Sequence, residues 1–157
     1  MNVHEITPDV DTNTLLPGAQ FVDAFSLETN GHALDARHAA ARTIARHPRW
    51  AEALLTLRNI LVAPFGLKTS GASKTAPREM IGIFPVLSAT PDRLVAGFND
   101  KHLDFRVVID VAASGAGQQV TLTTLVLTHN WLGRAYLAIV LPFHRLIVRA
   151  MLLQVAA

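Results

Sequence analysis

The stretch WLGRAYLAIVLPFHRLIVRAMLLQVAA, residues 131–157, decides the fold of this chain. Its only formally charged residues are Arg134, Arg145 and Arg149, which fall within one narrow arc of a helix at about 100° per residue. The pattern predicts one long helix that is apolar around most of its circumference. Such a helix needs another layer to cover it, and that layer is a sheet, a partner or a lipid surface.

The face of this helix opposite the arginines is predicted to turn inward. The positions on that face are Leu132, Tyr136, Ile139, Phe143, Ile147, Ala150 and Gln154. Pro142 removes one backbone donor and predicts a kink in the helix. Because a kinked helix lying across a curved sheet often leaves space beneath itself, the pattern favours a ligand cavity between helix and sheet.

The chain before this helix supplies the sheet. Phe21, Phe25 and Leu27 alternate with smaller residues and predict a first strand. Two helices are expected over 34–45 and 48–61, and four strands over 80–87, 93–98, 102–111 and 119–129. Strands that are grouped together favour an α+β fold with an antiparallel sheet. We expect an irregular lead-in over residues 1–19, one domain over 20–157 and a loop over 66–79.

Composition excludes several classes of function. The 157 residues are 50% hydrophobic and 17% charged, with a net charge of +2 and no cysteine. Disulfides, thiolate metal sites and a cysteine nucleophile are therefore excluded. The charge excess is small, and the basic run at His38, Arg42 and Arg46 has no interleaved aromatic residues, so we expect no nucleic-acid partner.

The two ends of the chain bear on location. Residues 1–8 have no basic stretch followed by an apolar core, so they do not predict a secretory signal. Three arginines and His144 interrupt the apolar C-terminal helix, and charges inside hydrocarbon are costly. We therefore expect a cytoplasmic protein without a transmembrane segment, while attachment to a membrane surface stays open.

Several blocks of sequence, taken in order, resemble one family. The blocks are 23–25 (DAF), 57–62 (LRNILV) running to 66–68 (GLK), 81–87 (IGIFPVL), 102–107 (HLDFRV), 129–130 (HN) with 132–134 (LGR), and 142–149 (PFHRLIVR). Together they resemble a mostly bacterial domain-of-unknown-function family, family 2867, which is similar to the polyketide-cyclase and START-like helix-grip (SRPBCC) superfamily. The resemblance covers roughly residues 20–153.

The resemblance implies a helix-grip fold. In that fold an antiparallel curved sheet wraps around a long C-terminal helix, with two short helices after the first strand and a cavity between sheet and helix. The family has no established catalytic motif, so the resemblance implies no reaction.

Asp23 is the most informative polar residue outside the long helix. By alternation it shares a strand face with Phe21 and Phe25, which predicts partial burial. A buried carboxylate needs a partner, and Arg58 or His144 can supply it. Asp23 is then either a general base or polar anchor in the cavity, or one member of a structural ion pair.

The other candidates for the pocket lie on the helix and on the strand at 102–111. Tyr136, Gln154 and His144 are polar groups on or beside the inward helix face. They are expected either to orient a ligand or to satisfy one another and the backbone. Phe105, on the inner face of its strand, and Phe143, on the helix, complete the set.

No motif for a cofactor, a metal or a hydrolytic nucleophile is present. No two histidines are four positions apart, and the glycines at 66–75 and 114–117 lack the context of a phosphate loop, so no cofactor or metal is expected. Three functions stay open. These are binding of a small apolar molecule, lipid-like or aromatic, a cyclase- or dehydratase-like enzyme that uses Asp23, Tyr136 or His144, and an interaction module that dimerises through apolar helix surface.

Overall fold

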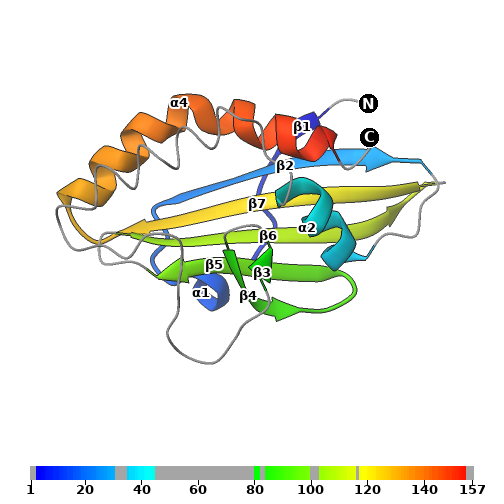
Figure 1. Cartoon of the computed structure of the whole chain (residues 1–157), viewed down its shortest axis with the longest axis horizontal. Coiled ribbons are helices and arrows are strands. Elements are labelled where there is room, and N and C mark those ends of the chain that lie inside the picture. The colour runs from blue at the N-terminus through cyan, green and yellow to red at the C-terminus, as the bar shows by residue number, and fades with distance from the viewer. Residues whose placement is uncertain are drawn as a thin grey trace.

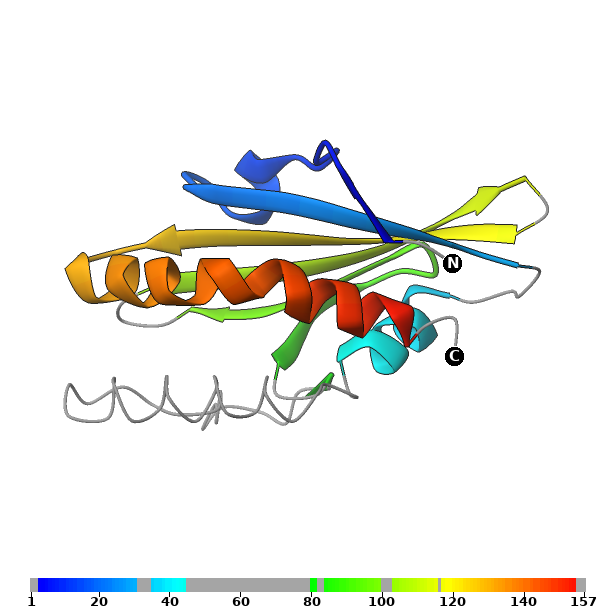
Figure 2. The same ribbon diagram turned by 90° about the horizontal axis from the view of Figure 1, so that it is seen from above.

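The computed structural model of the chain is an α+β structure, in which a curved, open antiparallel sheet carries the C-terminal helix on one face (Figures 1 and 2). The structure describes residues 3–30, 35–44, 80–81, 84–99, 103–115 and 117–154. Its elements are β1 (Val3–Ile6), α1 (Thr12–Leu15), β2 (Phe21–Thr29), α2 (Ala36–Ile44), β3 (Met80–Ile81), β4 (Phe84–Ala89), β5 (Arg93–Asn99), β6 (Leu103–Ser114), β7 (Gly117–Thr128) and α4 (Trp131–Leu153).

The strands follow the order β1-β2-β7-β6-β5-β4-β3, with antiparallel neighbours throughout. Strands β4 to β7 form the predicted meander, and β6 and β7 make a hairpin in which Ser114 pairs with Gly117. The predicted strand at 80–87 is instead two short strands, β3 and β4, which pair with each other. The first long strand, β2, lies beside the last, β7. This adjacency places Asp23 in the second strand from one edge of the sheet, opposite Thr124 of β7.

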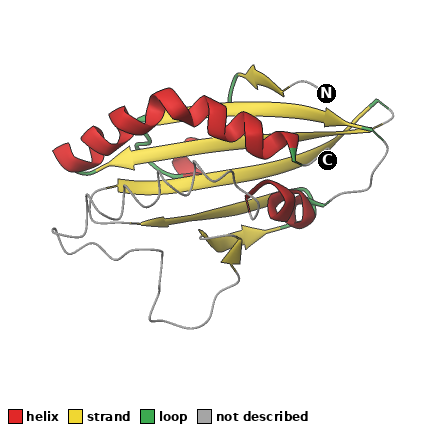
Figure 3. Cartoon of the chain, turned by 45° about the horizontal axis from the view of Figure 1, so that its top comes forward, coloured by secondary structure: helices red, strands yellow, loops and turns green. Residues whose placement is uncertain are grey.

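One face of the sheet forms the main core beneath α2 and the end of α4 (Figure 3). Strand alternation brings odd-numbered residues of β2 and β6 and even-numbered residues of β7 to this face. The apolar side chains buried there include Phe25, Leu27, Leu94, Ile109, Leu122, Val148 and Leu152. This packing fixes α4 against the sheet, because burying apolar surface is the dominant stabilising term.

The opposite face of the sheet is covered by the N-terminal residues. Leu16 is 3% exposed and packs in a second cluster with Val95, Val108 and Leu125. The prediction of an irregular lead-in was wrong in part, because β1 adds a strand next to β2 and α1 forms one helical turn. Both elements have four residues, which is too short for a period of 2 or 3.6 to stand out.

The number of helices also differs from the prediction. After the first strand the structure describes α2, which agrees with the helix expected over 34–45. The second expected helix, over 48–61, and the loop expected over 66–79 lie outside the described residues. Helix α1, before β2, was not predicted.

Helix α4 is the single long helix that the sequence predicts. It runs for 23 residues from Trp131, and the side chain of Asn130 caps it by accepting a hydrogen bond from the backbone N–H of Gly133 (3.1 Å). Pro142 lies near its middle, and the helix axis bends along its length in Figure 1. The bend agrees with the predicted kink, because Pro142 removes one backbone hydrogen bond of the helix.

The predicted inward face of α4 was wrong by about one residue, or about 100° of rotation. The buried helix positions are Gly133, Val148 and Leu152. Ile139 and Phe143, both expected to face the sheet, are 45% and 44% exposed. A helix that is apolar on most sides carries little information about which side a sheet will cover, so the sheet alone decides the orientation.

Candidate functional site between β2 and α4

A carboxylate–imidazole pair joins the sheet to the helix. The His144 Nε2 atom lies 3.0 Å from Asp23 Oδ2 and 3.1 Å from Asp23 Oδ1. The side chains of His144 and Asp23 are 14% and 10% exposed. The pair therefore lies largely out of water, where electrostatic interactions are stronger than at the surface.

The local structure explains why these two side chains meet. Asp23 stands opposite Thr124 of β7, and the Thr124 side chain is buried on the same face of the sheet. His144 lies four residues before Val148, about one helical turn, and Val148 is packed in the main core. The turn that Val148 holds against the sheet thus also directs His144 toward Asp23.

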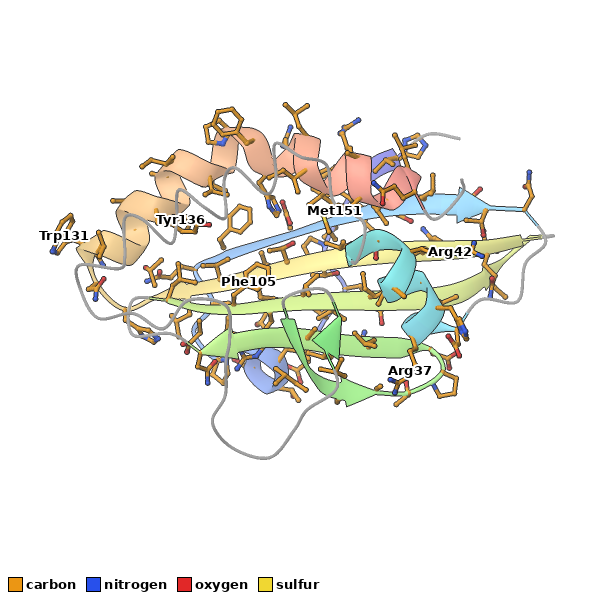
Figure 4. The ribbon with its side chains drawn as sticks, in the orientation of Figure 1. Arg37, Arg42, Phe105, Trp131, Tyr136 and Met151 are labelled. Atoms are coloured by element: carbon orange, nitrogen blue, oxygen red, sulfur yellow. The ribbon has the colours of Figure 1, made fainter. Side chains whose placement is uncertain are left out.

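One aromatic side chain contacts this pair, and others lie on the same side of the sheet. The ring of Phe21 meets the imidazole of His144 edge to face, with ring centroids 5.6 Å apart and an interplanar angle of 83°. Phe105 belongs to the same row of the sheet as Phe21, because each of them pairs with Val126. Figure 4 shows Tyr136 extending from α4 toward the sheet, above Phe105. The result is an aromatic region beside a polar pair.

The interface between α4 and the sheet has two chemically different halves. Near the end of the helix, Val148 and Leu152 fill an apolar core with Phe25 and Leu27. Between Gly133 and Val148 the helix has no buried residue. The sheet beneath that stretch presents the Asp23 carboxylate and the Thr124 hydroxyl. This mixed half is the candidate site.

The six predicted site residues fall into three groups. Asp23, His144, Tyr136 and Phe105 come from β2, α4 and β6 and lie in the interface between helix and sheet. Phe143 is on the outward side of α4. The sixth, Arg58, lies outside the described residues, so His144 is the partner of Asp23 that the structure identifies.

Two further residues bear on the predicted site. Gln154, expected on the inward face, follows the last turn of α4, and its side-chain oxygen is buried without a hydrogen-bond donor in the described part of the chain. Sequence reasoning missed Thr124, which is 2% exposed beside Asp23. A threonine at an inward position of a strand is the signal that could have found it.

The opposite face of the sheet carries a second carboxylate–imidazole contact. Asp104 Oδ1 lies 2.9 Å from His129 Nε2, and the His129 side chain is 39% exposed. Next to it, Arg106 Nη1 donates a hydrogen bond to the carbonyl oxygen of Phe105 (2.9 Å), and burial lowers the pKa of the Arg106 guanidinium. Across the described residues, no cluster of three or more His, Cys, Asp or Glu side chains could hold a metal ion.

Comparison with known proteins places the chain in a family. The profile of the family described as protein of unknown function (DUF2867) matches residues 15–151. The chain belongs to this family. Asp23, Phe105, Tyr136 and His144 all fall inside the matched region of this DUF2867 protein. No curated protein matches it significantly.

Three of the solved structures similar to this DUF2867 protein come from Geobacillus kaustophilus, Rhizobium leguminosarum and Mycobacterium smegmatis. A conserved protein from Geobacillus kaustophilus has 12% identity and a TM-score of 0.43, covering 87% of this chain and 93% of its own. An uncharacterised protein from Rhizobium leguminosarum has 13% identity, a TM-score of 0.40 and coverages of 86% and 95%. A protein from Mycobacterium smegmatis has 14% identity, a TM-score of 0.40 and coverages of 98% and 96%. Similarities of this size carry no argument about function.

Proposed function

We propose that this DUF2867 protein binds a small, mostly apolar molecule between the first half of α4 and the sheet. The observation that carries the proposal is the Asp23–His144 pair, largely buried in an otherwise apolar and aromatic interface. We also propose that the sheet and α4 form a helix-grip arrangement of the START-like (SRPBCC) type. The curved antiparallel sheet and the C-terminal helix across it support this assignment.

The energetics of buried charge favour a role for this pair beyond holding the fold. Taking a carboxylate and an imidazole out of water costs free energy, and an apolar pair of similar volume is often as stabilising. Small-molecule sites are mostly apolar and carry a few polar groups that orient the ligand. Asp23 and His144, beside the rings of Phe21 and Phe105, have this composition.

The same composition defines the class of ligand. A planar aromatic or lipid-like body fits against Phe21 and Phe105, where ring contacts add to the burial of apolar area. A single hydroxyl, carbonyl or carboxylate on the ligand would meet the imidazole of His144 or the phenol of Tyr136. Highly charged ligands such as nucleotides do not fit, because the described residues of this interface include no cluster of cations.

Native mass spectrometry of protein purified without detergent, followed by organic extraction, tests the proposal. We expect an added mass above 17.0 kDa, or binding of an added probe such as anilinonaphthalene sulfonate or a long-chain fatty acid. Phe105→Ala should weaken binding. Phe143→Ala is the matched control, since it removes the same ring from the outward side of α4. Equal binding by both variants, or none by the wild type, would contradict the site.

A second candidate function is proton transfer, as in a cyclase- or dehydratase-like enzyme. It is favoured by the contact of Asp23 with Nε2 of His144, because a carboxylate on one ring nitrogen fixes the imidazole and its tautomer. The other nitrogen, Nδ1, would then exchange the proton with the substrate. Given the extracted molecule as substrate, Asp23→Asn should lower kcat by about 10²–10⁴-fold while binding persists. Unchanged turnover would exclude this function and leave ligand binding intact.

A further inference from the structure

Helix α4 carries a ridge of exposed apolar side chains on the side away from the sheet. The outer ridge consists of Trp131, Ile139, Phe143, Leu146 and Leu153, which are 65%, 45%, 44%, 58% and 46% exposed. In the described part of the chain, α4 is the one helix long and apolar enough to cross a membrane by length and composition. Only 11% of its most apolar window is buried inside the protein. An exposed apolar patch of a few hundred Å² is often a functional surface.

The charge on α4 is of one sign. Residues 131–153 contain three arginines and no aspartate or glutamate. Arg134 is exposed, and the Arg145 side chain is 63% exposed while its Nη2 lies 2.7 Å from Glu5 Oε1 of β1. Arg149 is exposed as a residue, but its guanidinium carbon lies 5.9 Å from the centre of the Phe25 ring on the sheet side. Arginines that border an apolar ridge are complementary to a surface that is apolar inside and negatively charged outside.

We propose that the outer ridge binds the surface of an anionic lipid bilayer, with α4 lying in the plane of the membrane. The apolar side chains would enter the boundary between headgroups and acyl chains, and Arg134 would extend to the lipid phosphates, while Arg145 and Arg149 add positive charge near the membrane surface. Trp131, which Figure 4 shows projecting from the start of α4, would lie at the headgroup level, where indole rings are enriched. This proposal does not depend on the ligand site, which lies on the other side of the helix.

The structure argues against two other uses of the ridge. Insertion of α4 across a bilayer would remove Val148 and Leu152 from the main core and separate His144 from Asp23. Dimerisation through the ridge is the second use, and the available area is too small for it. A ridge about 33 Å long and about 10 Å wide covers ~330 Å². A stable dimer buries about 800 Å² on each partner. The helix also offers no carboxylate to a second copy's arginines.

Flotation of the full chain with lipid vesicles tests the proposal. We expect binding to vesicles of phosphatidylcholine mixed with phosphatidylglycerol, weaker binding to phosphatidylcholine alone, and loss of the difference at high salt. Arg134→Gln should weaken binding to the anionic vesicles by about fivefold. Equal affinity for both vesicle types would overturn the proposal.

A pair of substitutions tests whether vesicle binding depends on the outer ridge itself or on exposed apolar side chains anywhere on the protein. Leu146→Glu should reduce vesicle binding by more than about tenfold while thermal unfolding stays unchanged, because Leu146 is 58% exposed. Leu87→Glu, at a 39% exposed leucine of β4, is the matched control and should leave binding unchanged. If no vesicles bind and sedimentation shows a dimer that Leu146→Glu dissociates, the ridge is a protein interface and the lipid proposal is wrong.

Discussion

His144 of α4 contacts Asp23 of β2 across 121 positions of sequence, with its Nε2 atom within 3.1 Å of both carboxylate oxygens. Both side chains are largely out of water, at 14% and 10% exposed. The contact joins the middle of the helix, just after Pro142, to the second strand of the sheet. It therefore both stabilises the interface and gives that interface its chemistry.

The coupling free energy between Asp23 and His144 should be larger than that of a carboxylate–imidazole pair at the surface. In a double-mutant cycle with Asp23→Asn and His144→Gln, we expect about 1–2 kcal/mol from urea unfolding, because each partner left alone is a polar group out of water. The Asp104–His129 contact is the matched control. Its histidine is 39% exposed, so its coupling should stay below about 1 kcal/mol. Equal couplings would show that burial adds nothing.

The orientation of α4 can be tested with two leucines on the same helix. Leu152→Ala should cost about 2–4 kcal/mol of unfolding free energy, because the Leu152 side chain is fully buried in the main core. Leu146→Ala removes the same atoms from a side chain that is 58% exposed, and should change stability by less than about 0.5 kcal/mol. The reverse order would contradict the orientation of α4 in the structure.

Position 97 in β5 has no room for any side chain, so glycine is required there. Its φ is +153°, and a Cβ atom there would stand 2.1 Å from the carbonyl oxygen of Phe105. Gly97→Ala should therefore destabilise the protein by at least about 1–3 kcal/mol and weaken ligand binding, because β6 must shift. Gly115→Asn is the control, since φ is +55° with no atom within 4 Å, a conformation that asparagine accepts. Similar melting temperatures for the two variants would contradict this reasoning.

The cap of α2 should give the stability a dependence on pH. Asp35 Oδ1 accepts a hydrogen bond from the backbone N–H of His38 (2.8 Å), and this bond, with the His38 side chain, lowers the pKa of Asp35 below its ordinary 3.8. A lowered carboxyl pKa stabilises the fold above the unfolded-state value, and the effect is lost as pH falls through the folded-state value.

The wild type should therefore be more stable than Asp35→Ala at neutral pH, with the difference shrinking below about pH 4. Urea unfolding at several pH values measures it. Asp35→Asn keeps the capping acceptor without titrating, so its advantage over alanine should not change with pH. A difference between wild type and Asp35→Ala that is constant down to low pH would exclude the ionised cap as its source.

Several features are readable from the sequence because their cause is local. Period-2 alternation around Asp23 predicts its burial, and the side chain is 10% exposed. The apolar run after Asn130 predicts α4, and the grouping of strands predicts an antiparallel α+β fold. The cytoplasmic location, the boundary of the domain at residue 20, and the absence of a nucleic-acid partner stay predictions.

Other features depend on contacts between segments that are far apart in the sequence. Because α4 is apolar on most sides, its sequence allows several of its faces to turn inward. Contact with the sheet decides that Val148 is buried and Phe143 is exposed. Sequence left Arg58 and His144 as equal partners for Asp23, since nothing in a strand pattern states which helix turn crosses above it. The pairing of β2 with β7 and the docking of the helix bring His144 to Asp23, while Arg58 lies outside the described residues.

The sequence by itself determined the elements, the polarity of their faces and the residues able to do chemistry, because these follow from periodicity within one segment. Only the tertiary structure decided which side of α4 is buried, that the imidazole of His144 meets Asp23, and which apolar side chains form the outer ridge. Those outcomes depend on register and packing between segments more than one hundred positions apart, as the separation of 121 between Asp23 and His144 shows.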